Sequence, residues 1–299
     1  MRITDAGHYE GLKSHIQLSR QKLATAQEQL STGKKINRPS DDPAGAAAVI
    51  RLQTNVAEVE QFTRNVSEAQ TTLENGDQAL NSYQQLLDRA STLLTQASST
   101  TTLTQGKSSL ATELDSLTEQ IRQIANTKSG DGFFFGGSRL GAAPFDSNGV
   151  PAATPAVERT LQVDPGGTII SMGPLAENVF SDSTGSIIDA LKTASAAIRG
   201  TGDPVADQAT ELGALDRIKS FSNLADTART QLGSNLAILD HVTSRLSDQN
   251  LSYQQSISDT ESVDIAAAAL NLTQASTGLD AILQATAKVG QKSLLDFLG

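Results

Sequence analysis

A seven-residue repeat of apolar side chains between residues 52 and 94 constrains this chain more than any other feature. It consists of Leu52, Val59, Val66, Leu73, Leu80, Leu87 and Leu94. Such a repeat keeps one stripe of an α-helix facing a partner helix. At 1.5 Å per residue, a helix from Pro43 to about Ala97 would be roughly 80 Å long. The repeat therefore predicts a long helix whose apolar stripe must be covered by other parts of the chain.

The composition suits narrow seams between helices better than a thick aromatic core, because Trp is absent and aromatic residues make up only 4% of the chain. Cys is also absent, which excludes a disulfide scaffold and thiolate chemistry. The net charge of −10 argues against nucleic acid or a membrane surface as the main partner. No segment resembles a cleaved signal peptide or a membrane span, so export would use another route.

Four further segments show helical patterns: residues 12–30, 104–127, 187–199 and a long run that begins at Pro204. The dipeptide Asp203-Pro204 is a helix start signal. The heptad positions after it are Ile218, Ala225, Leu232, Leu239, Leu246 and Tyr253. We expect this helix to run antiparallel to the first long one and to cover its stripe. A final helix is expected from about Ser262.

Between Ser129 and Gly185 the helical period disappears, and five of the eight Pro fall there. Candidate strands are Gly132–Phe135, Glu158–Val163 and Thr168–Met172. The fold class is therefore predicted as mostly α, a long antiparallel helical bundle or coiled-coil rod with a small β-rich insertion at its tip. The predicted domains are a terminal coiled-coil domain (1–42 with 260–299), a helical rod domain (43–140 with 184–259) and the insertion (141–183).

The two ends of the chain carry thin apolar stripes that form a predicted assembly seam. Its members are Leu12, Ile16, Leu23, Leu30, Ile265, Leu272, Leu279, Ile282, Leu294, Leu295 and Phe297. Helices so lightly anchored are marginal by themselves, since most helix stability comes from packing. We expect the two ends to pair with one another and with copies from other subunits, because neither has a full partner inside the monomer.

A connector separates the first helix from the long one. Gly33 can end a helix, Pro39 forbids its continuation, and Asp42-Pro43 starts the next. Capping would explain both Asp41 and Asp42. The basic cluster of Lys34, Lys35 and Arg38 is either solvated or in contact with an acidic neighbour in an assembly. The predicted connector residues are Gly33, Asn37, Arg38, Pro39, Asp41, Asp42 and Pro43.

The run LSTGKKINRPSDDPAGAA, which starts at Leu30, resembles the N-terminal signature of the bacterial flagellin superfamily. The segment GFFFGG and the ending QKSLLDFL strengthen the resemblance, which covers about residues 1–145 and 205–299 and leaves the insertion unmatched. It implies a flagellin-like fold and a structural subunit that joins the hook-associated zone to the flagellin filament. It also implies that the chain ends stay mobile until they polymerise into the inner tube of an axial structure.

The same resemblance implies the partners and the location. The expected partners are copies of the chain in a ring, the adjoining hook-associated protein 1, flagellin, an export chaperone on the C-terminal segment and the flagellar type III export apparatus. The protein would be secreted into the extracellular flagellum without a cleaved signal peptide. Neither nucleic acid nor a membrane is expected as a partner.

No group of residues predicts catalysis. His8, His15 and His241 have no second ligand at metal-binding spacing. Gly106-Lys107-Ser108 imitates the end of a phosphate-binding loop, but Thr101 stands where the first Gly belongs. Because no nucleophile, base and orienting group come together, we expect neither an enzyme nor a cofactor or metal.

Two alternatives remain open at this point. The chain could be a flagellin, the filament subunit itself. It could also be a coiled-coil signalling protein of the chemoreceptor type, but such a protein would need a membrane span or a methylation helix rich in Glu/Gln pairs, and the sequence shows neither.

Overall fold

The structure of the protein is a computed structural model. It describes residues 2–99, 104–130, 132–139, 141–153 and 156–298, without the side chains of 2–9, 104–105 and 289–298. The chain divides into two compact units. We name Met1–Glu58 with Asp248–Gly299 the terminal unit and Val59–Ser247 the central unit. The domain limits expected from the sequence, 42/43 and 259/260 among them, stay a prediction.

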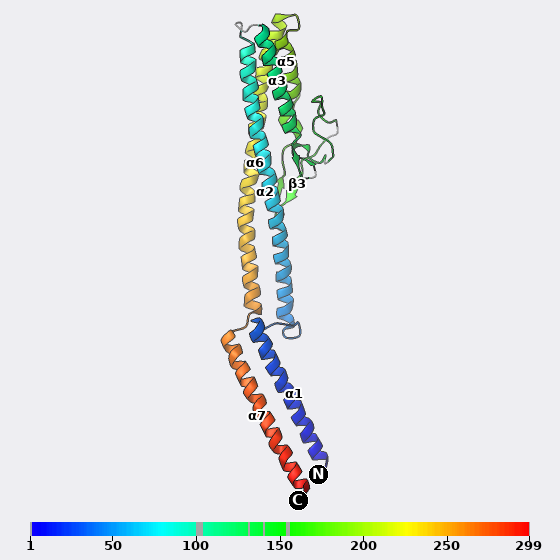
Figure 1. Cartoon of the computed structure of the whole chain (residues 1–299), viewed down its shortest axis with the longest axis vertical. Helices are drawn as coiled ribbons and strands as arrows, with labels where there is room; N and C mark the ends of the chain where they lie inside the picture. Colours follow the sequence, from blue (N-terminus) through cyan, green and yellow to red (C-terminus); the bar gives the residue numbers. More distant parts are fainter. Residues whose placement is uncertain (1, 100–103, 131, 140, 154–155, 299) are drawn as a thin grey trace. The chain divides into compact units, whose positions relative to one another are not determined.

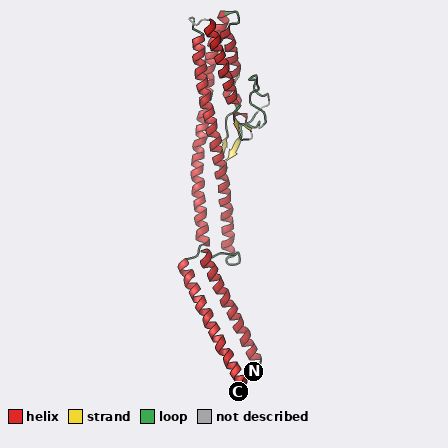
Figure 2. Cartoon of the chain, viewed as in Figure 1, coloured by secondary structure: helices red, strands yellow, loops and turns green. Residues whose placement is uncertain are grey.

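Helices dominate the described residues, which confirms the predicted mostly-α class (Figure 2). In chain order they are α1 (Arg2–Thr32), α2 (Pro43–Ala97), α3 (Thr104–Ala125), α4 (Ala176–Phe180), α5 (Ile187–Arg199), α6 (Pro204–Glu261) and α7 (Ile265–Leu298). The first helix begins earlier than the expected Leu12. Helix α5 has the predicted limits, and its N-cap Ser186 accepts a hydrogen bond from the Asp189 amide.

In the central unit, α2 and α6 pack together through the predicted stripes (Figure 1). The stripe from Val59 to Leu94 is buried at every heptad step, and so are the α6 positions from Ile218 to Leu246. Polar pairs flank the seam. They are Gln70 with Asp240, Asp77 with Arg229, and Gln84 with Asp226. The residue number of the α6 partner decreases as the residue number on α2 increases, so the two helices are antiparallel.

Helices α3 and α5 complete this bundle and pack against each other. The buried Ser195 hydroxyl on α5 donates to the Ala111 carbonyl on α3 at 3.1 Å. Helix α3 ends at Ala125, two residues before the expected end. The next residue explains the stop, because the Asn126 side chain hydrogen-bonds both the N–H and the carbonyl of Phe145 in the insertion.

The segment between α3 and α5, which we call the insertion from here on, contains three antiparallel two-stranded sheets among its described residues, all in the central unit. They are β1 (Lys128–Ser129) with β2 (Gly132–Phe133), β3 (Thr160–Gln162) with β4 (Ile169–Ser171), and β5 (Ser181–Asp182) with β6 (Gly185–Ser186). The central pair of β3 and β4 aligns Leu161 with Ile170. The strands β2, β3 and β4 are shorter than the sequence predicts, and neither β1 nor the pair β5–β6 was predicted.

Part of the first predicted strand was wrong, since Phe134–Gly136 forms a 3₁₀ turn. The reason is that Phe134 and Phe135 are both buried, whereas successive side chains of a strand point to opposite faces. Phe135 meets Phe180 edge to face at 5.0 Å, and Phe180 also contacts Tyr83 of α2 at 4.6 Å between ring centroids. This aromatic cluster joins the insertion to the long helix α2.

Polar side chains of α6 also bind the insertion. Arg245 pairs with the buried carboxylate of Asp164, which also accepts the N–H and the hydroxyl of Thr168. Asn235 donates to the Ser171 carbonyl at 2.9 Å. The buried amide of Asn235 therefore has a hydrogen-bond partner on β4.

Candidate assembly surfaces

In the terminal unit, α1 and α7 lie side by side (Figure 1). The predicted seam residues between them are only half-buried: Leu12, Ile16, Leu23, Leu30, Leu272, Leu279 and Ile282. Full burial is reached at the small residues Ala26 and Ala268. Small side chains let the helix backbones approach closely, but they bury little apolar area. The pair of helices therefore leaves much of its apolar stripe accessible to solvent.

One predicted seam residue lies away from the contact, because Ile265 is 66% exposed. Other large aliphatic side chains of the terminal unit are exposed as well: Leu18, Ile50, Leu251, Leu270 and Leu283. These five residues fall outside the heptad repeats, so the sequence pattern did not predict them. The side chains of Leu294, Leu295 and Phe297 lie outside the described residues.

A groove of about 610 Å³ runs between α1 and α7. Small and large apolar side chains, four side-chain amides, one hydroxyl and one ammonium line it. The lining residues are Leu18, Gln21, Lys22, Thr25, Ala26, Gln29, Asn271, Gln274 and Ala275. Such a mixed lining with a single charge is compatible with the close approach of another helix.

Backbone hydrogen bonds join the connector between α1 and α2 to the junction between α6 and α7. Gly33 has φ of +70°, which favours Gly and ends α1. Its carbonyl accepts the Val263 N–H at 2.9 Å, and the Lys35 N–H donates to the Glu261 carbonyl at 2.7 Å. The segments before α2 and after α6 are therefore paired within one chain.

The two carboxylates of the connector have different roles, which corrects one expectation. Asp42 caps α2, since its Oδ1 accepts the N–H groups of Ala44 and Gly45 at 3.1 and 3.0 Å. Asp41 does not cap the helix. Its Oδ2 accepts the N–H groups of Asn37 and Arg38, at 3.1 and 2.8 Å. Asp41 therefore closes the loop itself.

Two members of the connector's basic cluster, Lys34 and Arg38, have acidic partners within their own chain. Lys34 Nζ lies 2.5 Å from Glu261 Oε1, and Arg38 lies 3.3 Å from Glu28. The Asn37 amide donates to the Lys34 carbonyl, and Pro39 is exposed. The sequence pattern missed Ile36, which is buried next to Gly45. A Cβ atom added to Gly45 would come 2.6 Å from Ile36 Cδ1. Gly45 is thus required by close packing.

The described residues contain no group of three His, Asp or Glu that could hold a metal ion. His15 and His241 are exposed, and the side chain of His8 is outside the described residues. Within the same residues, no helix combines the length and the apolar character that crossing a membrane requires.

Comparison with known sequences gives relatives along most of the chain. Residues 7–136 match the bacterial flagellin N-terminal helical region. Flagellar hook-associated protein 3 of Escherichia coli is 28% identical, over 86% of this chain and 87% of that protein. The Salmonella typhimurium protein of the same name is 29% identical, over 88% and 89%. A flagellin of Listeria monocytogenes is 25% identical over 88% and 86%.

Solved structures share the fold. A putative flagellar hook-associated protein from Vibrio parahaemolyticus superposes with a TM-score of 0.69 at 19% identity, over 74% of this chain and 100% of that one. Flagellar hook-associated protein 3 from Legionella pneumophila gives a TM-score of 0.62 at 14% identity, over 71% and 98%. The resemblance to the bacterial flagellin superfamily that the connector predicted is therefore confirmed, and proteins named flagellar hook-associated protein 3 match this chain over most of its length.

Proposed function

We propose that this protein is a structural subunit of the bacterial flagellum that joins the hook-associated zone to the flagellin filament. The observation that carries the proposal is the similarity to two hook-associated protein 3 sequences over nearly nine-tenths of the chain, at 28% and 29% identity. The flagellin that covers the chain equally well is 25% identical. The junction role is therefore preferred to that of the filament subunit.

The proposed mechanism is polymerisation through α1 and α7. Their seam is half-buried in the single chain, and Ile265, Leu270 and Leu283 of α7 are exposed. Burying such side chains against neighbouring copies releases about 25 cal/mol for each Å² of apolar surface. Head-to-tail contacts of this kind close into rings or extend into helical filaments. The proposed assembly is a ring of identical copies that stacks under flagellin.

The partners in the proposal are copies of the chain, the adjoining hook-associated protein 1 and flagellin. An export chaperone would bind the C-terminal segment, and the flagellar type III apparatus would export the chain without cleaving a signal peptide. The apolar ending Leu294, Leu295 and Phe297 supports a need for cover before assembly, since exposed apolar clusters promote aggregation. The proposed role needs no catalysis.

Deletion of the gene in its own bacterium tests the proposal. Loss of a junction subunit should leave hooks without filaments, and intact flagellin should accumulate in the medium. Loss of a flagellin would leave no flagellin to release. Electron microscopy of the cells and an immunoblot of the medium distinguish these outcomes. Normal filaments on the deletion strain would contradict both functions.

A further inference from the structure

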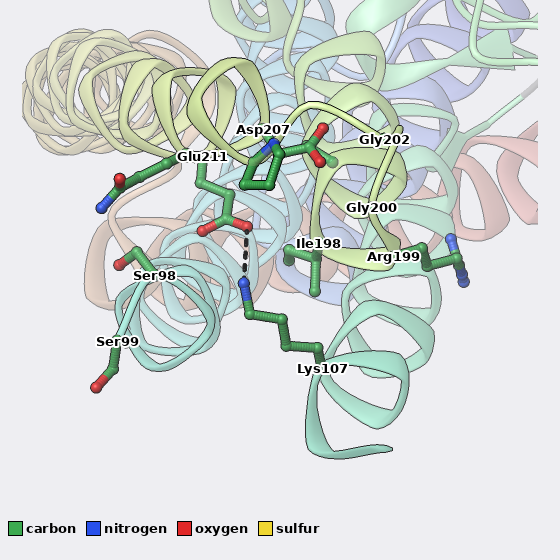
Figure 3. A pocket seen from close by; sticks show the side chains of 12 residues that line it. Ser98, Ser99, Lys107, Ile198, Arg199, Gly200, Gly202, Asp207 and Glu211 are labelled. Atoms are coloured by element: carbon green, nitrogen blue, oxygen red, sulfur yellow. Dashed lines mark ion pairs between the residues drawn. The ribbon is translucent and has the colours of Figure 1, made fainter. Parts of the chain in front are cut away.

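The central unit contains a pocket of about 410 Å³ at the ends of α2, α3, α5 and α6 (Figure 3). Ser98 just after α2, Ile198 of α5 and Pro204 of α6 contribute to its walls. Two side chains with opposite charges face each other across it, Lys107 from α3 and Glu211 from α6. None of the roles proposed above uses this pocket.

Glu211 is not satisfied by its surroundings. Its side chain is only 1% exposed, and Oε1 has no hydrogen-bond partner. Lys107 Nζ lies 3.9 Å away, which is too far for a hydrogen bond. Burial raises the pKa of Glu211, because desolvation disfavours the charged carboxylate. A buried carboxylate oxygen without a donor is unfavourable unless a further group enters the pocket.

The charges around the pocket favour a cation as that group. Arg199 is neutralised by Asp115. Asp207 accepts the N–H and the hydroxyl of Thr201, and these hydrogen bonds lower its pKa. Among the described lining residues, the carboxylates of Asp207 and Glu211 accompany the single ammonium of Lys107, and it is Glu211 that points toward that ammonium (Figure 3). The Lys107 side chain is 36% exposed, so its flexible stem can turn toward solvent.

We propose that this pocket binds a primary alkylammonium group. The ammonium would donate to Glu211 Oε1 and replace the distant Lys107 as the partner of the carboxylate. The alkyl part would lie against Ile198 and Pro204. The same chemistry occurs in a free small amine and in a lysine side chain of a second copy of this chain. Both sources place one positive charge on a short apolar stem.

Titration of the full-length protein with butylammonium chloride at pH 7 tests the site. Isothermal calorimetry should show saturable binding, with sodium chloride at equal ionic strength as the blank. Glu211→Gln should weaken binding at least tenfold, whereas Glu74→Gln, at an exposed position of α2, should leave it unchanged. Lys107→Met should bind more tightly, because the competing ammonium is gone. Circular dichroism establishes that each variant is folded.

Absence of saturable binding to the wild type would overturn the proposal, and so would equal affinity in Glu211→Gln. Weaker binding by Lys107→Met would also overturn the proposal, because it would show that the lysine contributes to binding instead of competing with the ligand. Sedimentation of the full chain then identifies the source of the ammonium. Self-association that Glu211→Gln reduces and Glu74→Gln does not would support a lysine of a second copy. Self-association equal in both variants, with butylammonium still bound, would support a free amine.

Discussion

The ring of Phe134 lies directly against the backbone of α2 at Gly76. A Cβ atom added to Gly76 would come 2.0 Å from Phe134 Cζ, far inside van der Waals contact. Gly in a helix interior normally lowers stability by about 1 kcal/mol relative to Ala. At this position the missing side chain creates the space in which the insertion packs.

We therefore expect Gly76→Ala to destabilise the protein despite its higher helix propensity. Overpacking of a core by one methyl group lowers the free energy of unfolding by about 1–3 kcal/mol. Urea unfolding followed by circular dichroism measures the difference. The matched control is Gly213→Ala in α6, where nothing lies within 4 Å of the added Cβ. This control should gain up to about 1 kcal/mol, and equal effects of the two substitutions would refute the packing argument.

The raised pKa of Glu211 predicts a pH dependence of stability. The folded state holds the Glu211 proton more tightly than the unfolded state, so ionisation of this carboxyl destabilises the fold as pH rises through its raised pKa. At about pH 4, near the ordinary pKa of Glu, most of this penalty is absent. The free energy of unfolding of Glu211→Gln relative to wild type should therefore increase between about pH 4 and pH 8.

Urea midpoints of both proteins across this range give the measurement. Other titrating groups, including Asp182 and Glu119 with their lowered pKa values, cancel in the difference. Glu74→Gln serves again as the control at an exposed carboxylate. A pH-independent difference for Glu211→Gln would show that the carboxylate is already solvated in the folded protein.

Leu272→Asp tests assembly through the terminal helices. Leu272 is half-buried and belongs to the terminal unit, so the thermal transition of the monomer should change little. Incorporation into flagella should be abolished, because a carboxylate in a desolvated seam is strongly unfavourable. Calorimetry of the monomer and complementation of a deletion strain give the two readouts. Leu272→Met is the conservative control and should assemble normally, while a large loss of monomer stability would contradict the reading.

Limited proteolysis of the dilute monomer tests how stable α1 and α7 are before assembly. We expect a protease to trim about the first 40 and the last 40 residues before it cuts the central unit, since helices with few buried contacts open more readily. Mass spectrometry of the fragments identifies the cut sites. Resistance of the full-length chain would mean that α1 and α7 are already stable as a pair.

The ion pair of Arg245 with Asp164 is expected to hold the insertion on α6. Asp164 is nearly buried while Arg245 is half exposed. A double-mutant cycle with Arg245→Met and Asp164→Asn should give a coupling energy of about 1 kcal/mol, between exposed and buried pairs. The solvated pair of Arg122 with Glu119, three residues apart on α3, should give less than about 0.5 kcal/mol. Equal coupling energies in the two cycles would contradict the expectation that burial of Asp164 strengthens its ion pair with Arg245.

The heptad stripes of α2 and α6 were predictable because a period of seven fixes which side chains share one helix face. The limits of α5 were predictable from its helical pattern, and the start of α6 from the Asp203-Pro204 dipeptide, which acts on backbone groups within one turn. The connector also follows from local signals, with Gly33 ending one helix and Asp42 capping the next.

The sequence by itself therefore determined the long helices, the buried stripes of α2 and α6 and the resemblance carried by the connector, since these depend on neighbours a few residues apart. The tertiary structure alone decided that Phe134 packs on Gly76, that Asp164 meets Arg245 and that Glu211 is buried beside Lys107. Each of these contacts joins residues more than fifty positions apart, and a Glu in the first turns of a helix ordinarily lies in solvent. Burial there results from how separate helices pack, and no local pattern encodes it.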